Sequence, residues 1–101
     1  MWVFALFDLP VDSKASRKAA AKFRKHLLKD GFQMLQFSVY ARNCASRESA
    51  DVHVARVQEG VPADGQVRII TITDQQFGRM LVFWGKKRRQ TEAPPLQLEF
   101  F

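Results

Sequence analysis

The sequence predicts a single α+β domain whose elements follow the order strand, helix, two strands, helix, strand, strand. Its 101 residues are the length of one domain. Hydrophobic residues make up 47% of the chain and charged residues 26%, a composition typical of a folded protein. Apolar runs of strand length alternate with segments whose apolar residues recur at helical spacing. These three observations define the fold class.

The first apolar run, residues 2–7, predicts a strand that ends beside a carboxylate. Its six residues are all apolar and half of them are aromatic, which favours a buried strand. Asp8 follows, and then Leu9 and Pro10. Because proline has no amide proton and biases the preceding residue toward an extended conformation, the strand should end there.

The next segment predicts an amphipathic helix from about Ser13 to Asp30. Asp12 or Ser13 can cap its start, and Gly31 stands where a left-handed residue commonly ends a helix. Its predicted apolar face consists of Ala15, Ala19, Ala20, Phe23 and Leu27. Its opposite face is basic and consists of Lys14, Lys18, Lys22, Lys25 and Lys29, flanked by Arg17 and Arg24.

Residues 32–42 alternate in part between apolar and polar side chains, with Phe37, Val39 and Ala41 expected on one side. Eleven residues is long for one strand, so we expect a bulge or kink near Gln36. A second helix follows over residues 46–58, with Ser46 as its cap.

The remainder predicts strands and a tail. Residues 67–73 are rich in β-branched side chains and favour a strand. A short turn over 75–78 and a strand over 80–84 should follow. We predict a domain over residues 1–85. Residues 86–101 should form a basic linker and a C-terminal strand that docks on another protein chain.

The predicted order corresponds to a ferredoxin-like βαββαβ sandwich with an extra C-terminal strand. Both helices would cover the same face of the sheet. Residues 2–7 and 80–84 are nevertheless apolar on both faces, and such strands require cover on both sides. A second copy of the sheet would provide it, so we predict a homodimer. A single chain with a half-exposed second face is the alternative.

The charge balance favours an anionic partner. Sixteen Lys and Arg against ten Asp and Glu give a net charge of +6, which suits nucleic acid or a membrane surface; simple solubility is the alternative. The lone Cys44 permits no internal disulfide, and the first apolar run is too short for a signal sequence or a membrane span. We expect a cytoplasmic protein without a membrane partner.

The basic helix is the main candidate for phosphate binding. No acidic residue lies between Asp12 and Asp30. Like charges four residues apart destabilise a helix by roughly 0.2–0.5 kcal/mol per pair, and bound phosphates would turn this repulsion into attraction. A solvated basic face is the alternative. The candidate nucleic-acid-binding residues are Lys14, Arg17, Lys18, Lys22, Arg24, Lys25, Arg42, Lys86, Lys87, Arg88 and Arg89.

Asp8 is the candidate metal ligand and catalytic residue. Hard oxygen ligands suit Mg²⁺ or Mn²⁺, and Mg²⁺ takes only one or two protein carboxylates. Two copies of Asp8 in a dimer would share one ion, which would serve phosphodiester hydrolysis. A turn-capping role is the structural alternative. His26 and His53 show no metal spacing, and no glycine-rich phosphate loop or nucleophile motif is present.

Two segments resemble the signatures of a known family. Residues 3–10, Val-Phe-Ala-Leu-Phe-Asp-Leu-Pro, resemble an opening strand that ends in Tyr-Asp-Ile-Pro, and residues 36–40, Gln-Phe-Ser-Val-Tyr, resemble Gln-x-Ser-Val-Phe. The family is the small CRISPR-associated protein two, an adaptation-module nuclease of antiviral defence. The resemblance extends from Trp2 to Trp84. Phe7 departs from it, because a tyrosine is frequent there.

The resemblance implies a ferredoxin-like homodimer with Asp8 as the metal-binding carboxylate. It implies a place in the spacer-acquisition complex, where the dimer bridges integrase dimers, binds duplex DNA and offers its C-terminal segment to the partner protomer or the integrase. It also implies a metal-dependent endonuclease activity on RNA or DNA. A stand-alone toxin-like endoribonuclease of the same fold and a dimer that senses a small molecule are the alternatives.

Overall fold

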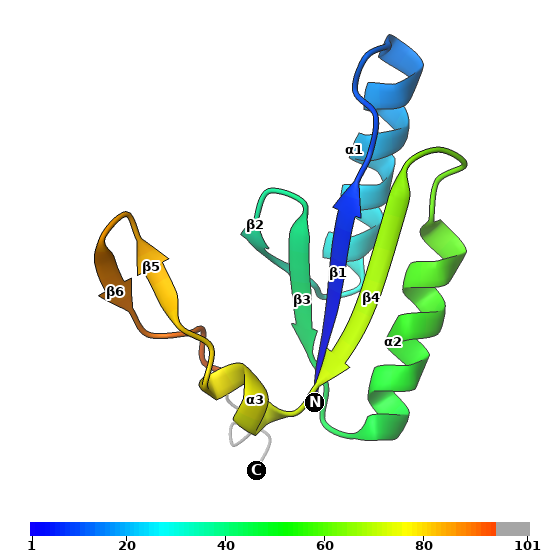
Figure 1. Ribbon diagram of the computed structural model, residues 1–101. Coiled ribbons are helices and arrows are strands. Elements are labelled where there is room, and N and C mark those ends of the chain that lie inside the picture. The colour runs from blue at the N-terminus through cyan, green and yellow to red at the C-terminus, as the bar shows by residue number, and fades with distance from the viewer. Residues whose placement is uncertain (95–101) are drawn as a thin grey trace.

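The computed structural model describes residues 1–94, which form a four-stranded sheet, two long helices on one of its faces, a short helix and a small hairpin (Figure 1). Among these residues, no helix is both long and apolar enough to cross a bilayer. The elements are β1 (Trp2–Asp8), α1 (Lys14–Lys29), β2 (Gln33–Gln36), β3 (Val39–Asn43), α2 (Arg47–Gly60), β4 (Gln66–Ile72), α3 (Asp74–Gly78), β5 (Val82–Trp84) and β6 (Lys87–Arg89).

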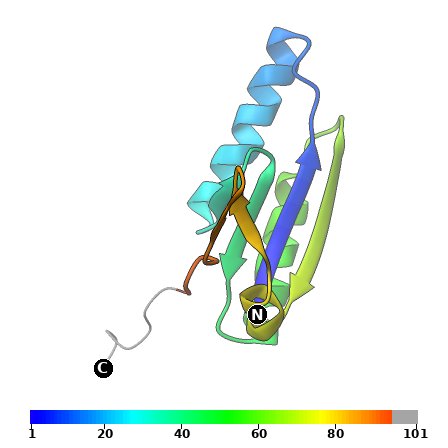
Figure 2. The same ribbon diagram turned by 60° about the vertical axis from the view of Figure 1, so that its left-hand side comes forward.

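The sheet has the strand order β2-β3-β1-β4, and each neighbouring pair is antiparallel. The strand β1 lies in the interior of the sheet, with Phe4 opposite Ala41 of β3 and Ile70 of β4. The helices α1 and α2 cover the same face (Figures 1 and 2). This arrangement confirms the predicted ferredoxin-like βαββαβ fold.

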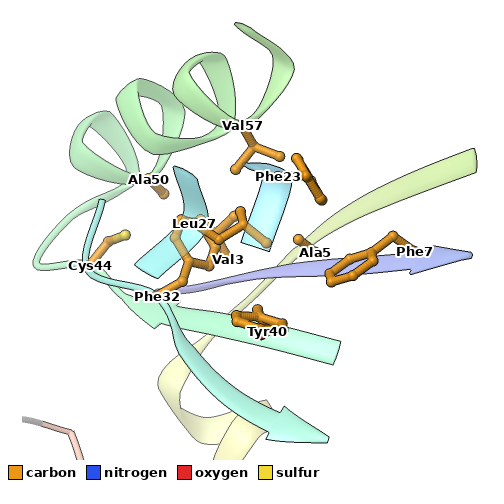
Figure 3. Packing of buried hydrophobic residues seen from close by; sticks show 10 residues of the cluster. All are labelled: Val3, Ala5, Phe7, Phe23, Leu27, Phe32, Tyr40, Cys44, Ala50 and Val57. Atoms are coloured by element: carbon orange, nitrogen blue, oxygen red, sulfur yellow. The ribbon is translucent and has the colours of Figure 1, made fainter. Parts of the chain in front are cut away.

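The apolar run of β1 is explained by burial on both faces of the sheet. Val3, Ala5 and Phe7 belong to the core beneath the helices, whereas Trp2 and Phe4 belong to a second cluster on the other face. Figure 3 shows the ten buried residues of the helix-side core, which are Val3, Ala5, Phe7, Phe23, Leu27, Phe32, Tyr40, Cys44, Ala50 and Val57.

The single cysteine of the chain, Cys44, is buried in this core. Only 2% of the Cys44 surface is exposed, and burial raises the pKa of its thiol above the ordinary value. The side chain therefore behaves as a small apolar group at neutral pH.

The helix boundaries agree closely with the prediction. The hydroxyl of Ser13 accepts a hydrogen bond from the amide of Ser16 at the start of α1, and Gly31 has a positive φ after its end. The same type of cap starts α2 at Ser46. The prediction of a buried apolar face on α1 is wrong for two of its residues, however. Ala15 and Ala19 are exposed, because the first turns of α1 extend beyond the end of the sheet (Figure 1).

Residues 32–42 form two strands, β2 and β3, as in the predicted element order, and a tight turn at Phe37 and Ser38 joins them. The irregularity predicted near Gln36 is confirmed by a register shift between Met34 and Gln36. Ser38 has a φ of 66°, a left-handed conformation that serine rarely adopts, and its carbonyl accepts a hydrogen bond from the Phe7 amide. Phe37 is consequently 89% exposed rather than aligned with the side chain of Val39.

The expected turn at residues 75–78 is the helix α3. Thr73 and Gln76 form a reciprocal capping box at its start. The helix places Phe77 flat against Trp2, with ring centroids 3.8 Å apart and planes 5° from parallel. Thus α3 covers one end of the sheet face that the longer helices leave open.

The strands β5 and β6 form a separate hairpin that leads away from α3 (Figures 1 and 2). Their pairing crosses the predicted boundary between residues 85 and 86, so Lys87–Arg89 form a strand and not part of a linker. The predicted strand 80–84 begins at Val82 and is not part of the main sheet. The C-terminal strand predicted over 96–101 lies outside the described residues.

Candidate carboxylate site and nucleic-acid interface

Asp8 is the last residue of β1, and its side chain is exposed. Hydrogen bonding to β4 places it opposite Gln66. The neighbouring Gly65 has a φ of 89° and packs so closely that a Cβ there would lie 2.7 Å from the carbonyl oxygen of Asp8. The backbone of Asp8 is therefore held on a rigid element while its carboxylate faces solvent.

Phe7 anchors this strand end in the helix-side core. Successive residues of a strand point to opposite faces, so Phe7 enters the helix-side core while Asp8 stays outside it. Its ring makes an edge-on contact with Phe23, with centroids 5.0 Å apart, and a tilted contact with Tyr40 at 5.5 Å. The packing fixes the position from which the carboxylate projects.

Within the described residues, Asp8 is not surrounded by enough candidate ligands to form a metal site in one chain. Among residues 1–94, no three His, Cys, Asp or Glu side chains gather into a group able to hold a metal ion. His53 is instead hydrogen-bonded to Asp30, and His26 to a backbone carbonyl of α2. An exposed carboxylate with room for water suits Mg²⁺ as a single ligand, and a second copy of Asp8 would complete a two-carboxylate set.

The basic face of α1 is present as predicted. Five of the candidate residues on this helix are exposed, namely Lys14, Arg17, Lys18, Lys22 and Lys25, and Arg24 is half-buried. None of the six takes part in an ion pair within residues 1–94. Arg17 also donates a hydrogen bond to the carbonyl of Val11 in the β1–α1 connection. This connection joins the start of the basic helix directly to the strand end that carries Asp8.

Arg42 has a different environment from the other candidates. Its Nε donates to the backbone oxygen of Asp30 and its NH1 to that of Asn43, both at 2.8 Å. The side chain also packs against Gly31, just beyond the end of α1. The guanidinium therefore fastens α1 to β3, and its donors are directed at main-chain carbonyls.

The second basic cluster lies on the β5–β6 hairpin. Lys86 occupies its turn, Lys87–Arg89 form β6, and all four side chains are exposed. The guanidinium of Arg89 lies 4.9 Å from the ring centroid of Trp84, a cation–π contact. The hairpin follows α3, which packs on Trp2 at the opposite end of β1 from Asp8.

Apolar side chains remain exposed on the sheet face opposite α1 and α2. A hollow of about 660 Å³ lies between this face and the hairpin. It is lined mainly by apolar residues, including Phe4, Leu35, Met34, Phe37, Phe83 and Trp84. The last four are more than half exposed, which is unusual for side chains gathered around one hollow.

The fold and the site define a small ferredoxin-like α+β protein with an exposed carboxylate at the end of β1 and a basic helix beginning beside it. The chain belongs to the family of CRISPR associated protein Cas2, whose family model matches residues 1–80. The resemblance seen in the two sequence segments is thereby confirmed.

Known relatives match over the whole chain. A protein of Parvibaculum lavamentivorans is 59% identical over 101 residues, covering all of both chains. A protein of Flavobacterium psychrophilum is 50% identical and one of Paracidovorax avenae 46% identical; this chain covers 88% and 94% of their lengths. All three are named CRISPR-associated endoribonuclease Cas2.

Proposed function

We propose that this protein is a nucleic-acid-binding subunit of the CRISPR spacer-acquisition complex, in which a homodimer bridges integrase dimers and holds duplex DNA. Family membership supports the assignment to CRISPR adaptation. The exposed basic face of α1, which forms no ion pair within the described residues, is the observation that carries the proposal.

The basic face suits a phosphate backbone better than a base-reading surface. Its side chains are mostly lysines, which act as mobile point charges, and phosphate contacts carry no sequence information. Binding would release counterions and relieve the repulsion along the helix. The expected interaction is therefore sequence-independent and sensitive to salt.

The dimer is supported by the exposed apolar side chains around the hollow between sheet and hairpin. A second copy would remove the remaining exposed surface of Phe37, Phe83 and Trp84 from water, which would favour association. In a two-fold symmetric dimer, the same surface patch of each protomer forms the interface, as is common in homodimers. We assign residues 86–101 the role of docking on the partner protomer or on the integrase.

Nuclease activity would depend on Asp8. In the proposed dimer, the two copies of Asp8 would hold one Mg²⁺ or Mn²⁺ ion, which would supply Lewis acidity for phosphodiester hydrolysis. The chain itself contributes the rigid strand end that fixes the carboxylate and the cations of α1 that bind the phosphates of the substrate.

RNA cleavage outside an integration complex is the second candidate function. The name of the relatives, endoribonuclease, favours this function. It requires the same carboxylate but no integrase. Co-purification with an integrase from cells that express both proteins separates the two functions, since a toxin-like ribonuclease would be recovered alone.

Charge reversal on α1 tests the central proposal. Lys18→Glu combined with Lys22→Glu replaces two exposed cations on the basic face. We expect affinity for duplex DNA to fall and the slope of log K against log salt to decrease in magnitude by about two to four, because each chain loses two lysines and the proposed homodimer loses four. Filter binding at several salt concentrations measures both quantities.

Arg47→Glu with Arg79→Glu makes the same change of charge at two exposed positions outside α1 and serves as the matched control. These changes should reduce binding much less than the α1 variant does. Unchanged affinity and salt dependence in the α1 variant would reject this helix as the binding surface.

A further inference from the structure

Polar contacts centred on Asp30 fasten the C-terminal end of α1 to two other elements. His53 Nδ1 lies 2.8 Å from one carboxylate oxygen, and Arg56 NH1 donates to the other at 2.9 Å. The backbone oxygen of Asp30 accepts the bond from Arg42 described above. Residues from α1, α2 and β3 therefore meet at Asp30, whose side chain is only 11% exposed.

A second contact joins the same helices about one turn earlier along α1. His26 Nε2 lies 2.6 Å from the backbone oxygen of Arg56. The His26 ring also rests against Gly60, where any Cβ would overlap it. We call His26, Asp30, His53, Arg56 and Gly60 the α1–α2 polar seam.

The negative charge of Asp30 lies at a position where the helix dipole disfavours it. The residue caps the C-terminus of α1, where the helix dipole presents partial negative charge. Burial by itself raises the pKa of this carboxyl group. The hydrogen bonds and positive charge of His53 and Arg56 outweigh burial, so that the pKa lies below its ordinary value. The carboxylate is thus stabilised by α2.

Apolar packing does not provide the same geometric control. Phe23 and Leu27 attach α1 to the sheet by apolar packing, which includes the edge-on contact of Phe23 with Phe7 described above. Hydrogen bonds require both a distance and an angle. The hydrogen bonds of the seam therefore add directional restraints, beyond those of the core, on the helix that carries the exposed lysines.

We propose that the α1–α2 polar seam positions α1 for nucleic-acid binding, so that its cations match the spacing of backbone phosphates. The inference rests on the proposed function, in which this helix binds the phosphates. Asp30, His53 and Arg56 are positioning residues, which act through the lysines of the helix and contact no nucleic acid themselves.

Asp30→Asn tests the proposal, because the proposal and simple electrostatics predict opposite changes in the affinity for duplex DNA. The change keeps the side-chain size and raises the formal net charge from +6 to +7. If Asp30 acted only through its charge, duplex DNA would bind more tightly. The seam predicts weaker binding, on the order of fivefold, the low end of typical coupling between sites.

Asp51→Asn is the matched control, because it removes the same charge from an exposed position on α2. It should bind duplex DNA as tightly as the wild-type protein, or slightly more tightly. Thermal unfolding of each variant identifies a temperature at which all are folded, and the affinities are compared there.

Gly60→Ala perturbs the seam without changing any charge. Alanine favours a helix over glycine by about 1 kcal/mol, so stability should not fall for reasons of propensity. Its methyl group nevertheless displaces the His26 ring. We expect weaker duplex binding with a smaller salt slope, because fewer lysines reach phosphates at the same time. This variant also provides the test if Asp30→Asn fails to fold.

The outcomes distinguish the two proposals. If the Lys18 and Lys22 charge reversal weakens binding but Asp30→Asn and Gly60→Ala bind like Asp51→Asn, the seam inference is overturned and the proposed function stands. If that charge reversal leaves binding unchanged, the proposed function fails, and the seam inference fails with it.

Discussion

Asp8 combines a rigid backbone with an exposed carboxylate, and this makes its role testable without disturbing the fold. Substitution of an exposed side chain usually changes stability by less than about 0.5 kcal/mol. We expect Asp8→Ala to abolish cleavage of RNA and DNA in Mg²⁺ while the dimer and its affinity for duplex DNA remain. Gel assays of the purified variant measure cleavage, and Asp51→Ala is the control. Full cleavage by Asp8→Ala would refute the catalytic role.

At the level of single residues, sequence reasoning identified which side chains are charged but not what they contact. The exposure of Asp8 follows from its place after an apolar run that ends before proline. Arg42 was grouped with the phosphate-binding candidates, although its donors bind main-chain carbonyls. The pairing of Asp30 with His53 joins residues 23 positions apart, and no local pattern indicates such a contact.

At the level of elements, the strongest periodic patterns predicted the structure best. The caps and the apolar positions Phe23 and Leu27 located α1 within about a residue at each end. The turn at Phe37 and Ser38 was missed, because serine gives no signal for a left-handed conformation. The helix α3 was missed although its capping box, Thr73 and Gln76, is visible in the sequence.

The junction of α1 and α2 should also show a characteristic response to acid. The lowered pKa of Asp30 means that folding favours its ionised form. The resulting stability is fully present above the ordinary carboxyl pKa of 3.8, and it is lost as the pH falls through the lowered native value. The imidazole of His53 and the guanidinium of Arg56, both on α2, face the carboxylate of Asp30, and the guanidinium of Arg42 on β3 faces its backbone oxygen.

Urea unfolding between about pH 5 and pH 3 measures this contribution. We expect the midpoint of the wild-type protein and of Asp51→Asn to decline more steeply across this range than that of Asp30→Asn. Equal slopes for the three proteins would contradict this prediction, because they would show that the pKa of Asp30 does not differ between the native and the unfolded state.

At the level of the whole molecule, the order of the elements was enough to predict the sheet topology. The order βαββαβ is that of the ferredoxin-like arrangement, and the observed sheet agrees with it. The hairpin β5–β6 was not predicted, since a run of four cations gave no strand signal. The homodimer stays a prediction. It explains why Phe83 and Trp84 lie exposed beside a sheet whose other face is well covered.

Sedimentation velocity at low ionic strength, with and without duplex DNA, measures both the homodimer and its binding to DNA in one experiment. We expect a protein of twice the 11.6 kDa chain mass that shifts entirely into a faster complex when DNA is added and returns to the free dimer at high salt. A species of single-chain mass whose sedimentation is unaffected by DNA would contradict this expectation.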